Sequence, residues 1–120
     1  MVLVRTLAAA IPVLLALTLP AQRAEPAGAE PADPVEAVYY RYAVVEYCSL
    51  LSPTVVHGFE AERDRLVAAA GLDEEQHRQH RLAGWTAADR EWSNRGLGGY
   101  RNWCRTEGEA AAAGFIDAAP

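Results

Sequence analysis

The sequence predicts a small all-α protein, a bundle of about four helices with one disulfide, preceded by a signal peptide and a disordered linker. Three observations predict this fold. From position 35 onward apolar residues recur at helical spacing, and no sustained period-2 alternation indicates a strand. Proline and glycine divide this region into pieces of helical length. The two cysteines, Cys48 and Cys104, lie in different pieces, where a bridge can join them.

Residues 1–21 have the order of a secretory signal peptide. Arg5 precedes an apolar run from Leu7 to Leu19, and Pro20 and Ala21 follow as a cleavage region. The run is shorter than the roughly 20 residues that a membrane-spanning helix needs. We therefore expect cleavage, no stable membrane anchor afterwards, and a periplasmic or secreted protein in a compartment where disulfides persist.

Residues 22–34 are rich in proline, alanine and glutamate and contain no large apolar side chain. Such a segment cannot bury enough surface to offset its ordering entropy, so we expect a disordered linker. The helical domain is expected over residues 35–116, with Asp33 as cap and Pro34 as first residue of its first helix. Residues 117–120 are expected to form a disordered tail.

Turn signals divide the domain into four helices. Ser52–Pro53 cannot continue the first helix, expected to end near Leu51, and begins the second. Gly71 ends the second helix. Asp73, with Gln76 three residues later, has the pattern of a capping box and begins the third. The last two helices are expected over residues 73–94 and 99–116.

The stretch from Gly84 to Cys104 is expected to form the centre of the core. It contains all three tryptophans, and large rings bury the most apolar area per side chain. Gly84 lies within a helix at a cost in helix propensity, which predicts close helix packing there. The residues of the last helix expected to face inward are Tyr100, Cys104, Ala111 and Phe115, with Leu97 just before them.

We expect Cys48 and Cys104 to form a disulfide between the first and last helices. In an exported chain, two cysteines allow one internal pairing. Closing so long a loop would stabilise the fold by roughly 4 kcal/mol in the chain-entropy model. Free redox thiols and an intermolecular bridge remain as alternatives.

His77 and His80 lie three residues apart, so one helix face can carry both side chains as metal ligands. Glu74 lies one turn earlier, and a complete site would need another ligand, such as His57. The alternative is an exposed polar first turn. We expect no cofactor.

Basic residues gather in one part of an acidic chain. The formal net charge is −5, which argues against nucleic-acid binding, and the absence of lysine excludes a catalytic lysine. Residues 76–106 nevertheless carry a net charge of +4. These arginines either pair within the molecule or line a surface for a carboxylate, a phosphate or an acidic partner. The candidates for such a surface are Arg90, Arg95, Arg101 and Arg105.

Asp89 lies between two tryptophans in the sequence, and a carboxylate held among rings can act as an acid. The simpler interpretation is that Asp89 pairs with Arg101 or Arg105. No serine has the setting of a nucleophile elbow. We therefore single out no catalytic residue.

The segments YRYAVVEYCSLLSP (Tyr40–Pro53) and GWTAADREWSNRGLGGYRNWCRTEG (Gly84–Gly108) resemble a set of small exported proteins from alphaproteobacteria. The resemblance implies a compartment and a helical fold but no catalytic residues, because that family has no established activity. Some members carry an inherited label of signal recognition particle. Such a particle needs a methionine-rich groove, and the single methionine here is Met1.

The sequence as a whole predicts binding rather than catalysis, by an interaction or accessory module with a protein partner in the cell envelope. Two alternatives remain open. One is a metal or small-ligand binding protein that uses His77 and His80. The other is an enzyme inhibitor, or an enzyme, that acts through the surface from Asp89 to Arg105.

Overall fold

The computed structural model describes residues 29–120, so the predicted signal peptide and most of the predicted linker lie outside the described residues. In this range the chain is all-helical and contains the predicted disulfide between Cys48 and Cys104, which are 56 positions apart. The elements in order are α1 (Pro34–Tyr47), α2 (Pro53–Ala70), α3 (Glu74–Asn94), α4 (Tyr100–Trp103), the π-helical turn η1 (Cys104–Gly108) and α5 (Glu109–Ala118).

The local signals for helix starts are confirmed. The Asp33 side chain accepts hydrogen bonds from the backbone N–H groups of Val35 and Glu36 at the start of α1. Ser52 caps α2 in the same way, and Asp73 and Gln76 form the complete capping box of α3. Each cap satisfies backbone donors that have no partner within the helix, which fixes where the helix begins.

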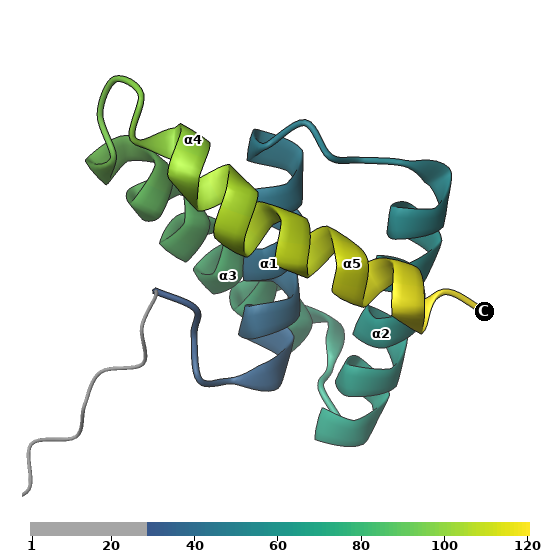
Figure 1. Cartoon of the computed structure of the whole chain (residues 1–120). Helices are drawn as coiled ribbons and strands as arrows, with labels where there is room; N and C mark the ends of the chain where they lie inside the picture. The colour runs from purple at the N-terminus through teal and green to yellow at the C-terminus, as the bar shows by residue number, and fades with distance from the viewer. Residues whose placement is uncertain (1–28) are drawn as a thin grey trace, which may run out of the picture.

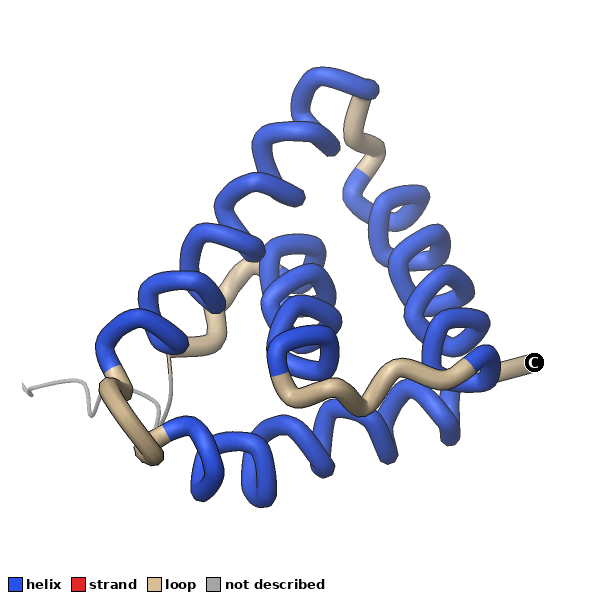
Figure 2. The backbone as a smooth tube through the Cα atoms, turned by 90° about the horizontal axis from the view of Figure 1, so that it is seen from above, coloured by secondary structure: helices blue, strands red, loops and turns tan. Residues whose placement is uncertain are grey.

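α1 lies at the centre of the molecule. Figure 2 shows it enclosed by α2, α3 and the continuous rod of α4, η1 and α5, and in Figure 1 that rod crosses α1. Its buried residues surround the whole helix: Val35, Ala37, Val38, Tyr39, Tyr40, Ala43, Val44 and Val45. α1 is therefore covered from more than one side (Figure 2).

The expectation that the stretch from Gly84 to Cys104 forms the centre of the core is wrong. Trp103 is 1% exposed, but Trp85 and Trp92 are only partly buried and pack at the edges of two clusters built mainly on α1. The physical reason is the width of the apolar surface. α3 is polar over most of its circumference and can bury only one stripe, whereas α1 can be buried on nearly every side.

Gly84 lies where α3 crosses α1, and here the prediction of close packing is confirmed. A Cβ atom added to Gly84 would clash with the backbone oxygen of Glu36 and would lie 2.8 Å from the Cβ of Tyr39. The helices can approach this closely only because position 84 has no side chain. The contact therefore fixes the register of α3 against α1.

The last helix turns a different face toward the core from the one predicted. Trp103 faces the core together with Ala111 and Phe115, whereas Tyr100 is 38% exposed and Leu97 is fully exposed. The cause is η1, because a π-helical turn adds about one residue to the helix and rotates everything before it. A 3.6-residue period drawn through the whole segment therefore selects the wrong residues in its first turn.

The two ends of the domain are more ordered than predicted. α5 continues to Ala118, two residues into the predicted disordered tail, because Phe115 in the core anchors its last turn. Ala29 packs against the cluster around Trp103, and the carboxylate of Glu30 lies 3.8 Å from the guanidinium of Arg41. The last residues of the predicted disordered linker therefore contact the domain.

α1 ends at Tyr47, earlier than the predicted end near Leu51. Ser49 adopts φ of 56°, and the N–H groups of Ser49 and Leu50 donate to the backbone oxygens of Glu46 and Val45. This is a Schellman motif, in which the left-handed position usually holds glycine. Gly71 occupies that position, with φ of 63°, at the end of α2.

Replacing Ser49 with glycine is therefore expected to raise the free energy of unfolding by up to about 1 kcal/mol, because glycine adopts the left-handed conformation without steric cost. Chemical denaturation would measure the change. Ser93→Gly, in ordinary helical conformation near the end of α3, is the matched control and should not stabilise. Equal effects of the two changes would contradict the strain at Ser49.

Candidate functional site

A hollow of about 620 Å³ opens beside the disulfide, at the end of α1. We call it the arginine hollow. Its lining residues are Tyr47, Cys48, Ser49, Tyr100, Arg101, Cys104 and Arg105. They come from the end of α1 and from α4 and η1, two segments that the disulfide ties together.

The disulfide and the π turn place two arginines at this hollow. Arg101 and Arg105 lie one helical turn apart, on either side of Cys104, and both are exposed. Cys48 lies so close to the last helix that a Cβ added to Gly108 would be 2.9 Å from its sulfur. Among residues 29–120, neither arginine forms an ion pair with a carboxylate. Both guanidinium groups are thus available to an external anion.

Tyr47 forms one wall of the hollow and is held on two sides. Its ring stacks on Trp92 with centroids 5.0 Å apart, and its hydroxyl donates a hydrogen bond of 2.8 Å to Asp89. Burial raises the pKa of the Tyr47 phenol, and the hydrogen bond to Asp89 raises it further. The phenol therefore stays protonated at neutral pH and acts as a donor.

A second hollow, of about 350 Å³, adjoins the first because Tyr100 lines both. Its other lining residues are Trp92, Ser93, Gly96 and Leu97. The rings of Trp92 and Tyr100 are 5.3 Å apart, and Leu97 is fully exposed at the tip of the turn between α3 and α4. The two hollows share Tyr100, and their lining residues include cationic, aromatic and aliphatic side chains.

The four predicted arginines do not lie on one common surface. Arg101 and Arg105 meet at the arginine hollow, while Arg90 is exposed on α3 and lines neither hollow. Arg95 is used internally: it lies 2.8 Å from Glu91 and 3.7 Å from Glu107, and its guanidinium is 5.2 Å from the ring centroid of Trp103. The pairing of Arg95 connects the end of α3 to the last helix.

The expectation that Asp89 pairs with Arg101 or Arg105 is wrong. Its carboxylate accepts the hydrogen bond from Tyr47, and within the described part of the chain it forms no ion pair with an arginine. The reason is the register of α3 against α1, which brings Asp89 to the end of α1. Asp89 thus positions a wall of the hollow and leaves the two arginines unneutralised.

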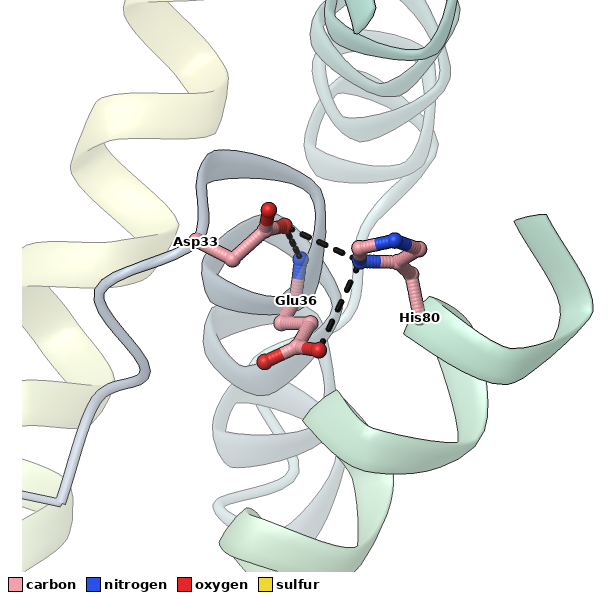
Figure 3. A group of neighbouring side chains, drawn as sticks. All are labelled: Asp33, Glu36 and His80. Atoms are coloured by element: carbon pink, nitrogen blue, oxygen red, sulfur yellow. Dashed lines mark hydrogen bonds and ion pairs between the residues drawn. The ribbon is translucent and has the colours of Figure 1, made fainter. Parts of the chain in front are cut away.

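The two predicted metal ligands on α3 do not converge. Nε2 of His77 is 2.6 Å from the hydroxyl of Tyr39, whereas Nδ1 of His80 is 3.2 Å from Asp33 and 3.4 Å from Glu36 (Figure 3). Within residues 29–120, the group of possible metal ligands lying within 4.8 Å of one another is Asp33, Glu36 and His80. His77, Glu74 and His57 lie outside this group.

Sequence reasoning missed Asp33 and Glu36 as neighbours of His80, although it identified Asp33 as the cap of α1. The missing information was the register between α1 and α3. The signal was Gly84, which contacts the backbone of Glu36 and lies one turn after His80 on the same helix. A close crossing at Gly84 brings His80 to the start of α1.

Comparison with protein-family models, with curated proteins and with solved structures finds no match. Within residues 29–120, no helix combines the length and the apolar composition needed to cross a membrane.

Proposed function

We propose that this chain is an exported protein-interaction module that binds an acidic segment of a partner in the cell envelope through the arginine hollow. The observation that carries the proposal is the pair Arg101 and Arg105. Both are exposed, both flank the disulfide, and neither has a carboxylate partner among residues 29–120.

Export to the periplasm or the exterior is the first part of the proposal. The pattern of residues 1–21 supports it, and so does the Cys48–Cys104 disulfide, because such bonds form and persist in oxidising compartments. The resemblance to small exported alphaproteobacterial proteins points the same way. A processed N-terminus in the envelope fraction, found by mass spectrometry, would support export, whereas an intact chain in the cytoplasm would contradict it.

Binding through the arginine hollow is the second part. Protein interfaces are enriched in tyrosine, tryptophan and arginine, and the largest contributions come from such residues when they fill hollows. Here Tyr47, Tyr100 and Trp92 provide the aromatic walls, and Leu97 provides an exposed aliphatic contact. A guanidinium binds carboxylates in a two-bonded, planar geometry, so acidic side chains of the partner can pair with Arg101 and Arg105.

A photo-crosslinking amino acid at position 97 would test this proposal in living cells, because Leu97 is fully exposed beside the hollow. We expect a specific crosslinked partner whose yield falls about tenfold or more when Arg101 and Arg105 are both replaced by alanine, since each charge-assisted contact contributes about 1.5–3 kcal/mol. Mass spectrometry of the crosslinked species would identify the partner and its contacting segment.

The matched control is the double variant Arg65→Ala and Arg81→Ala, which removes the same charge from exposed positions on α2 and α3. It should leave the crosslink unchanged. Equal crosslink yields from the two double variants, or a partner whose contacting segment is not acidic, would contradict the proposal. Circular dichroism would verify that all variants are folded.

A further inference from the structure

We infer that Asp33, Glu36 and His80 form a binding site for one divalent transition-metal ion, with Zn²⁺ as the reference ion. This inference is independent of the proposed function. The three residues lie at the start of α1, whereas the arginine hollow lies at its end, about 20 Å away along a helix of this length.

The spacing of the three side chains matches a metal coordination sphere. Four ligands at about 2.0 Å from a tetrahedral zinc ion are about 3.3 Å from one another. Nδ1 of His80 is 3.2 Å from Oδ1 of Asp33 and 3.4 Å from Oε1 of Glu36, and the three ligand atoms lie within 4.8 Å of one another. Figure 3 shows both carboxylates turned toward the same edge of the imidazole. The two distances to Nδ1 of His80 are therefore close to those between ligands of one ion.

Two of the ligands are held in position by contacts that do not involve the ion. Oδ1 of Asp33 accepts hydrogen bonds from the N–H groups of Val35 and Glu36, which fixes the carboxylate at the start of α1. The same oxygen lies 3.2 Å from Nδ1 of His80, so the cap also positions the atom that faces the imidazole. His80 is placed by the Gly84 crossing, one turn further along α3. Positioning of this kind lowers the ordering cost of binding.

The charge of the site also favours a cation. Two carboxylates face one imidazole, and the positive end of the α1 dipole, equivalent to about half an elementary charge, offsets only part of their charge. The side chains of His80, Glu36 and Asp33 are 27%, 29% and 39% exposed. The site is thus partly shielded from solvent but still accessible, so water molecules can complete the coordination of the ion.

The donor set indicates the class of ion. Imidazole nitrogen suits zinc, copper and nickel, and carboxylate oxygen suits harder ions, so one nitrogen with two carboxylates favours a borderline dication such as zinc over copper(I) or calcium. Because the ligands come from α1 and α3, the ion would connect these two helices at the end remote from the disulfide. The alternative arrangement, with no ion, is a His80 N–H shared between the two carboxylates.

Titration calorimetry with Zn²⁺ tests the inference on the chain as purified from the expressing cell, without a histidine tag. We expect one ion per chain with a dissociation constant in the micromolar range. Glu36→Gln keeps the shape and a hydrogen-bonding oxygen but removes a charged ligand, so it should weaken binding more than about tenfold, and His80→Gln should abolish it. His57→Gln, on the exposed face of α2, is the matched control and should bind like the parent chain.

The three histidines also give a direct spectroscopic test. Paramagnetic Co²⁺ should broaden the ring-proton NMR signals of His80 first, before those of His77 and His57. Absence of binding at millimolar zinc would overturn the inference and leave the plain hydrogen-bonded arrangement. Binding that survives both Glu36→Gln and His80→Gln, or broadening of His57 first, would overturn it as well.

Discussion

Replacing Cys48 and Cys104 together by serine is expected to lower the free energy of unfolding by roughly 4 kcal/mol, the largest effect of any change proposed for this chain. The bridge closes a loop of 56 positions, and in the chain-entropy model the loss of that constraint favours the unfolded state by about this amount. A domain of this size has a total stability of only about 5–15 kcal/mol. Denaturant titration of parent and variant would measure the difference.

The unmodified protein titrated in strong reductant is the control for this experiment. It should lose as much stability as the double serine variant, because both remove the same covalent constraint. Parent and variant that unfold at the same denaturant concentration would contradict the expected role of the disulfide. Under the proposed function, the variant should also weaken partner binding, since Cys48 and Cys104 line the arginine hollow together with Arg101 and Arg105.

Gly84→Ala is expected to cost about 3 kcal/mol of stability although alanine is the better helix former. The added methyl group would overlap the backbone oxygen of Glu36 and lie 3.0 Å from the backbone nitrogen of Tyr40. Backbone atoms of a buried helix cannot move aside like the end of a flexible side chain. The helices must therefore separate, and overpacking of this kind costs about 1–3 kcal/mol or more.

Gly114→Ala is the matched control for this change, because a methyl group there meets no atom within 4 Å. It lies in α5 and should raise stability by about 0.5–1 kcal/mol through helix propensity alone. Denaturant titration of both variants would measure the two changes in the free energy of unfolding. The midpoints can be compared directly if the free energy falls with denaturant concentration at the same slope in both variants. A gain in stability at both positions would show that α3 and α1 are not in the close contact described.

The features that the sequence predicted correctly are those that depend on neighbours along the chain. Asp33, Ser52 and the Asp73–Gln76 pair each satisfy backbone groups within a few residues, so the starts of the helices could be predicted without a tertiary structure. The disulfide could be predicted because two cysteines allow one internal pairing.

The features that could not be predicted depend on how the helices pack. The π turn after Trp103 rotates the last helix, and no fixed period reveals such a turn, so Tyr100 was expected to face inward although it is 38% exposed. For the candidate site, Arg101 and Arg105 were identified from the excess of arginine in residues 76–106. Internal pairing was one of the two alternatives for these arginines, but the sequence did not indicate that Arg95 would be the one to pair with Glu91 and Glu107, which belong to two different elements.

The central position of α1 has a consequence for the order in which the molecule is built. Synthesis proceeds from the N-terminus, so the helix with the most buried residues emerges before the other helices described, while the last element that covers it is α5 (Figure 2). Until residues 100–118 have been synthesised, part of the apolar surface of α1 stays exposed to solvent. Cys48 also has no cysteine with which to form a disulfide. A ribosome-bound or truncated chain ending before residue 100 should therefore be captured by holding chaperones and degraded, and oxidation of the thiol pair would mark the completion of folding.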